Sequence, residues 1–152
     1  MALPVTMYRW DDVGAPQIVD GKPSEYMNVL KKCLVEGYGS KASLGWSVAE
    51  EIAVPPYIAF KNDVTAGGSG GVITFSADND LQGTVVKYES CQDYIDKDNQ
   101  MRKSAYSGFD RYIDSDLYRL NKWFVIGTSK AFYLFIFSQY HLDNGNYQGT
   151  RE

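Results

Sequence analysis

The stretch YMNVLKKCLVEGYGSKASLGW, at residues 26–46, decides the fold of this chain. In its first half the apolar side chains recur three or four residues apart, which is the spacing of one face of an α-helix. These side chains are Tyr26, Met27, Leu30, Cys33 and Leu34. Because such a helix buries its apolar face against another element, we expect residues 24–36 to form a helix that packs on a β-sheet.

Local signals define both ends of this helix. Pro23 and Ser24 are typical of a helix start, and Lys31 and Lys32 suit the negative end of the helix dipole. Gly37 follows at the position where helices commonly end in a left-handed residue. The chain then turns through a glycine-rich elbow, residues 37–46, into the next strand.

The elbow resembles a signature of a known protein family. The run GYGSK at residues 37–41, followed by Gly45 and Trp46, is similar to a signature of small tailed-bacteriophage virion proteins that are structural or tail-associated. A looser likeness continues in the same order at residues 58–62, 67–75, 88–93, 123 and 132–135. Residues 94–118 do not share it.

The resemblance implies a non-enzymatic structural component of a phage particle, associated with its tail or baseplate. A protein of this class is made in the cytoplasm of the bacterial host and is located in the virion. Its partners are other virion proteins and further copies of itself, because symmetry and effective concentration make modest contacts strong. We therefore expect a homo-oligomer or multicopy assembly that uses no cofactor.

Composition sets further limits. The chain has 152 residues, 44% of them hydrophobic, which is enough for a single domain, residues 1–152, with its own core. The net charge is −4 and the Lys and Arg residues are scattered, so we expect no nucleic-acid partner. No apolar run approaches the ~20 residues that cross a bilayer, so we expect no membrane partner. Residues 142–152 are expected to form a polar tail.

The remaining patterns are mostly those of strands. We expect strands at residues 5–10, 46–54, 57–61, 72–76, 84–91, 122–126 and 131–138. The last is continuously apolar, which predicts a central strand that is buried on both faces. Residues 92–118 lack a sustained period and predict a long Tyr-rich surface loop, with a helical turn near residues 114–120. The expected fold class is α+β: mainly antiparallel sheet with one amphipathic helix packed on it.

Aromatic residues supply most of the candidate contact residues, since the chain has 12 Tyr, 7 Phe and 3 Trp. Tyr and Trp bury a large area while keeping a polar group, which suits protein interfaces as well as cores. The interface candidates are Tyr38, Ser40, Lys41 and Trp46 at the elbow, and Tyr94, Tyr106, Tyr112 and Tyr118 in the expected loop. The alternative is a purely intramolecular role for the elbow, with Trp46 in the core.

One segment matches most of a calcium-binding loop. Asp78, Asp80, Gln82 and Glu89 occupy positions one, three, five and twelve of an EF-hand pattern. The flanking residues are typical of strands, whereas an EF-hand requires helices on both sides. We therefore expect a hairpin turn, with a calcium site as the weaker alternative.

Two enzymatic alternatives are also visible. Ser69 lies in a G-x-S-x-G pattern and His141 follows it, but a strand comes after Ser69 where a hydrolase elbow needs a helix. Several carboxylates could supply a glycosidase pair or a sugar-binding surface. They are Asp93, Asp96, Asp98, Asp110, Asp114 and Asp116. A host-surface or carbohydrate-binding module is thus the first alternative function, and a hydrolase is the second.

The two cysteines point to no metal site. Cys33 lies on the apolar face of the expected helix and Cys91 near the end of a strand, with no C-x-x-C pattern and no pair of His residues. We expect buried free thiols, and a disulfide between the two residues is the alternative.

Overall fold

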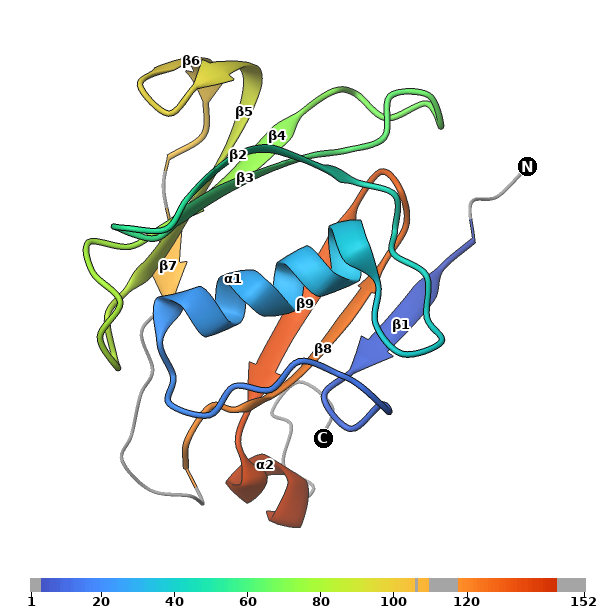
Figure 1. The fold of residues 1–152 in the computed structure, drawn as a ribbon, viewed down its shortest axis with the longest axis vertical. Coiled ribbons are helices and arrows are strands. Elements are labelled where there is room, and N and C mark those ends of the chain that lie inside the picture. Colours follow the sequence, from blue (N-terminus) through green and yellow to red (C-terminus); the bar gives the residue numbers. More distant parts are fainter. Residues whose placement is uncertain (1–3, 106, 110–117, 145–152) are drawn as a thin grey trace.

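A computed structural model describes residues 4–105, 107–109 and 118–144 of the chain. They form two antiparallel sheets with a helix packed against both (Figure 1). The smaller sheet has the order β1-β8-β9, with β1 at Thr6–Arg9, β8 at Lys122–Gly127 and β9 at Phe132–Phe137. The predicted α+β class, mainly antiparallel sheet with a packed helix, is confirmed.

The larger sheet contains the middle of the chain and has the order β2-β3-β4-β5-β6, with β7 also paired to β5. Its strands are β2 (Ser47–Ile52), β3 (Tyr57–Lys61), β4 (Val72–Ser76), β5 (Val86–Asp96), β6 (Asn99–Lys103) and β7 (Ser107–Phe109). Each pairing in both sheets is antiparallel.

The helix expected at residues 24–36 is confirmed. It consists of α1 (Pro23–Lys31) and one further π-helical turn, η1 (Lys32–Glu36). Gly37 ends it with φ of +80°, and a Cβ at this glycine would lie 2.6 Å from the carbonyl oxygen of Lys41. A side chain at position 37 would therefore collide with the elbow, which explains the glycine.

The elbow turns back and donates hydrogen bonds to carbonyl groups in the last turn of the helix. The amide of Leu44 donates to the carbonyl oxygen of Cys33 at 3.0 Å, and the amide of Trp46 donates to that of Leu34 at 2.9 Å. These carbonyls lie in the last turn of a helix, where such groups have no partner within the helix itself. The elbow thus fixes the position of β2 relative to α1.

One hydrophobic core joins the helix to both sheets. Its fully buried side chains come from the helix, from the smaller sheet and from the larger sheet: Leu30, Leu34, Tyr8, Trp123, Val125, Ile58, Phe60 and Val86. Trp123 is 0% exposed, and its ring N–H donates to the carbonyl oxygen of Pro16 at 3.1 Å. The core is therefore shared, and neither sheet buries its apolar face by itself.

The expectation that residues 131–138 form a central strand is wrong. β9 is an edge strand that pairs with β8 alone among the described strands, and β8 is central. Tyr133 and Phe135 of β9 are 68% and 44% exposed on its outer face. The run is continuously apolar because both faces of β9 carry apolar side chains. One face meets the interior, and the other forms an exposed aromatic surface.

The long surface loop expected at residues 92–118 is also wrong for the part that the structure describes. β5 continues to Asp96 and returns as β6, so that Asp93 pairs with Met101 and Tyr94 with Gln100. The polar sequence conceals these strands because much of the hairpin is exposed. Residues 118–120 contain no helix, and the rest of the expected helical turn lies outside the described residues.

The C-terminal part of the described chain forms a second, short helix, α2 (Gln139–Asn144). It includes the first residues of the tail expected at 142–152, and the remainder lies outside the described residues. In the described parts of the chain, no helix has both the length and the apolar character needed to cross a membrane.

Replacing Trp123 tests the shared core. We expect Trp123→Ala to lower the free energy of unfolding by about 3–5 kcal/mol, because it leaves a cavity between the helix and β8. Tyr133→Ala, at the exposed face of the neighbouring strand, should change it by no more than about 0.5 kcal/mol. Urea unfolding of both variants measures the difference, and equal effects would contradict a core centred on Trp123.

Candidate functional site

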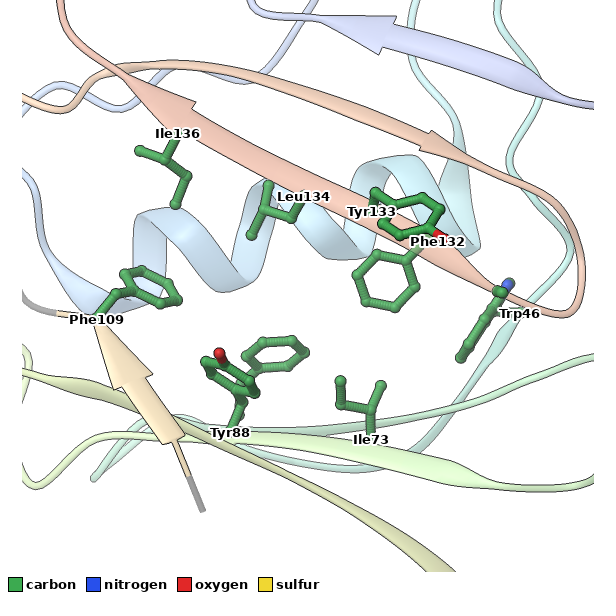
Figure 2. Close-up of a pocket in the computed structure, with 10 residues that line it drawn as sticks. Trp46, Ile73, Tyr88, Phe109, Phe132, Tyr133, Leu134 and Ile136 are labelled. Carbon is green, nitrogen blue, oxygen red and sulfur yellow. The ribbon is translucent and has the colours of Figure 1, made fainter. Parts of the chain in front are cut away.

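An apolar groove lies between β9 and the inner face of the larger sheet (Figure 2). Its volume is about 640 Å³, which is in the range of ligand pockets. One wall consists of Trp46, Ile73, Phe75, Tyr88 and Phe109, and the other of Ala131, Phe132, Tyr133, Leu134 and Ile136. The two walls come from segments that are far apart in the sequence.

The wall on the larger sheet is a row of aromatic rings on adjacent strands. Phe75 of β4 and Tyr88 of β5 are cross-strand partners with ring centroids 6.0 Å apart, and Phe109 of β7 lies 6.5 Å beyond Tyr88. Trp46 closes one end, because its ring N–H donates to the carbonyl oxygen of Thr128 at 3.0 Å and its ring meets Phe132 edge-on. These contacts hold the groove open in a defined shape.

The chemistry of the groove is that of a binding surface. The described residues that line it carry two phenol groups and one indole, and none of them has a carboxylate, imidazole, thiol or ammonium group. Such a lining stabilises a partner by burying apolar area and provides no strong acid, base or nucleophile.

The backbone of β9 adds hydrogen-bonding groups to the rim. The amide of Thr128 donates to the carbonyl oxygen of Ala131 at 2.8 Å across the β8–β9 turn. On the other side of β8, the carbonyl oxygen of Trp123 accepts from the amide of Trp10 at 3.0 Å, so this carbonyl group does not point toward β9. Since antiparallel pairs alternate, the N–H and C=O groups of Phe132, Leu134 and Ile136 point away from β8. The groove therefore lies beside a strand edge that is free of any other described strand.

The elbow candidates are mostly used inside the chain. Tyr38 and Trp46 are each 8% exposed, and the hydroxyl of Tyr38 donates to Asp12 Oδ2 at 2.6 Å. Lys41 is half-buried, with Nζ 3.0 Å from Asp12 Oδ2 and 2.6 Å from the carbonyl oxygen of Met7. Ser40 is exposed. Tyr38 and Trp46 thus have little surface to offer a partner.

The loop candidates are dispersed. The hydroxyl of Tyr94 donates to Glu50 Oε1 at 2.6 Å and lies 2.8 Å from that of Tyr57. Burial, followed by the hydrogen bond to Glu50, raises the pKa of Tyr94 above its ordinary value. Tyr118 is 44% exposed and its ring lies 5.2 Å from that of Tyr140. Tyr106 and Tyr112 lie outside the described residues.

The calcium candidates do not converge. Asp80 accepts from the amide and hydroxyl of Ser24, at 2.8 and 2.7 Å, so it caps the start of α1. Asp78 lies 3.6 Å from Lys87, and Glu89, on β5, lies 3.3 Å from Lys103. In the described part of the chain, no group of three His, Cys, Asp or Glu side chains could hold a metal ion.

The hydrolase candidates are also separate. The Ser69 hydroxyl accepts from Asn62 Nδ2 at 3.2 Å and from the amide of Gly71 at 3.1 Å, whereas His141 Nδ1 lies 3.0 Å from the hydroxyl of Ser138. Figure 1 shows the β3–β4 connection, which contains Ser69, and α2, which contains His141, at opposite ends of the molecule. His141 therefore cannot act as the base for Ser69 in this arrangement.

The carboxylates expected for sugar chemistry are engaged elsewhere or fall outside the described residues. Asp93 accepts from Arg102 at 2.6 Å, and Asp96 from Asn99 at 2.8 Å. Asp98 is exposed, whereas Asp110, Asp114 and Asp116 are not described. The cysteines are buried free thiols, as predicted, and no disulfide joins them.

Sequence patterns missed two features of this structure. The groove was missed because its walls meet only in the folded chain, and a continuous apolar run does not show which surroundings its faces have. Asp12, which no sequence pattern above singled out, is the centre of a polar cluster. Its Oδ2 accepts from the amide of Arg9 at 2.7 Å, the hydroxyl of Tyr38 at 2.6 Å and the ammonium of Lys41 at 3.0 Å.

This cluster makes stability depend on pH. Burial by itself would raise the pKa of Asp12, but the hydrogen bonds from Tyr38 and Arg9 and the charge of Lys41 lower it overall. A carboxyl with a depressed folded-state pKa stabilises the fold above its unfolded pKa of about 3.9, and this contribution is lost as the pH falls through the folded-state pKa.

We therefore expect Asp12→Asn to lower the free energy of unfolding by about 1–3 kcal/mol near pH 7, where the ionised acceptor is lost. The difference from the wild type should shrink in acid, as the pH falls from the unfolded-state pKa of about 3.9 through the lowered pKa of Asp12 in the folded chain. Urea unfolding near pH 7 and in acid measures this. An undiminished difference in acid would contradict the stabilising role of the ionised carboxylate.

The cap at α1 gives a second prediction. We expect Asp80→Asn to lower the free energy of unfolding by about 1 kcal/mol, because it removes the negative charge at the start of the helix. Asp78→Asn is the matched control, since the side chain of Asp78 is 81% exposed and should contribute little. Equal losses in the two variants, measured by thermal unfolding, would refute the capping role.

Comparisons with family models, curated proteins and solved structures gave no significant match for this chain.

Proposed function

We propose that this chain is a non-enzymatic structural component of a phage particle, associated with its tail or baseplate, that acts through contacts with other proteins. The observation that carries the proposal is the apolar groove beside the free edge of β9. Such a site buries a partner's apolar surface and provides no catalytic group among its described lining residues. The likeness of the GYGSK and Gly45-Trp46 signature to phage virion proteins supplies the biological setting.

A second exposed surface supports an assembly role. The outer face of the smaller sheet presents Met7, Tyr133 and Phe135, which are 38%, 68% and 44% exposed. Phe135 stacks on Phe124 of the next strand with ring centroids 4.5 Å apart. Apolar side chains gathered on one sheet face are typical of an interaction surface. In a multicopy particle, modest contacts at this face and at the groove would reinforce each other.

A carbohydrate-binding module on the host-facing side of a tail is the alternative. The exposed ring of Tyr133 favours it, because sugar rings stack on such a surface. Its cross-strand neighbour is Ile126, which pairs in turn with Met7, so this row supplies no carboxylate for sugar hydroxyls. The outer face therefore fits a protein partner better.

Light scattering of the purified chain across concentration, alone and with particle components, tests the proposal. We expect a discrete multimer of the 17.1 kDa chain, or incorporation into tails. Tyr133→Glu should shift this equilibrium toward the monomer, because it places a charge on the outer face. Leu81→Glu, at a loop residue that is 67% exposed, should leave it unchanged.

A chain that stays monomeric at all concentrations and joins no particle component would contradict the proposed function. Saturable binding of sugars by that monomer would instead favour the carbohydrate-binding alternative.

A further inference from the structure

The free edge of β9 differs from the β2 and β6 edges of the larger sheet. The β2 edge carries Glu50 and Glu51 and has an irregular register at Val48/Glu50. The β6 edge carries Arg102 and Lys103. Charges and irregularities of this kind protect edge strands from pairing with other chains. β9, whose sequence is FYLFIF, has none of them.

The groove provides space for side chains beside that edge. Phe132, Leu134 and Ile136 point from β9 toward Ile73, Tyr88 and Phe109 (Figure 2). A strand added to β9 would place every second side chain on this same face, since side chains alternate along a strand. Those side chains would enter the groove, and the intervening ones would lie beside Tyr133 and Phe135.

We infer that the groove receives an extended segment of a partner protein, which adds to β9 as a fourth strand of the β1-β8-β9 sheet. The inference rests on the proposed function and names the partner's chemistry at the same site. The segment is uncharged along the groove and has apolar side chains at alternate positions. Main-chain hydrogen bonds to β9 would supply affinity, and the groove would select the side chains.

Two properties of the site select this occupant. The outward N–H and C=O groups of Phe132, Leu134 and Ile136 match a polypeptide backbone, whereas an apolar small molecule would cover them without hydrogen bonds, at a free-energy cost. The described lining carries no charged side chain, so electrostatic complementarity favours an uncharged segment over an acidic or a basic one.

The test uses the full chain and a short synthetic peptide in which valine alternates with threonine between terminal lysines. In NMR spectra we expect main-chain contacts between the peptide and Phe132, Leu134 and Ile136. A matched peptide is N-methylated at the residues whose N–H groups face β9. It should bind about 10-fold more weakly or worse, because it loses those hydrogen bonds.

Two variants that introduce the same charge at different places provide the comparison. Leu134→Glu places a charge in the groove and should abolish peptide binding. Leu81→Glu, at a loop residue that is 67% exposed, places the charge away from β9 and should leave the affinity within about 3-fold. Urea unfolding shows whether Leu134→Glu is folded. The comparison of the unmodified and N-methylated peptides on the wild-type chain tests the inference without either variant.

Absence of binding, equal binding of the two peptides, or contacts away from β9 would overturn the inference. A multimer that forms while the peptide fails to bind would overturn it and leave the proposed function standing. Peptide binding at β9 by a chain that stays monomeric and joins no particle component would support strand addition and contradict the structural role.

Discussion

The structure depends on the burial of one helix by two sheets. Each sheet has one inner apolar face, and Leu30 and Leu34 of the helix lie in the core that both faces share. At about 25 cal/mol for each Å² of apolar surface removed from water, this burial is the main source of stability for a chain of this size. The elbow follows from the same constraint, because residues 37–46 must return from the helix end to β2 and satisfy its last carbonyl groups.

The groove follows from how the helix is placed. α1 packs between the two sheets, and on the β9 side the sheets face each other across the space that the aromatic residues line. β9 is therefore exposed in two ways, through its outer aromatic face and through its free edge. Both the proposed structural role and the proposed addition of a partner strand depend on β9. The elbow residues, in contrast, mainly make contacts within the chain.

The sequence predicted what depends on local pattern. The helical spacing from Tyr26 to Leu34 and the position of Gly37 gave the helix and its end, and short apolar runs gave most strands. It could not predict that β9 lies at an edge, because a continuous apolar run looks the same whether its faces meet a core, a groove or a surface. It also could not place Asp80 at the start of α1, since that contact joins residues 56 positions apart.

Amide hydrogen exchange of the free chain tests the central claim that β9 is a folded strand with one free edge. Tyr133 and Phe135, whose amides face β8, should exchange slowly, and Phe132, Leu134 and Ile136 should exchange at least about 10-fold faster, because their amides point away from β8 at the strand edge. Uniform protection of all five amides would show that another element already occupies this edge. Uniformly fast exchange would show that β9 does not pair stably with β8, and either result would contradict the account.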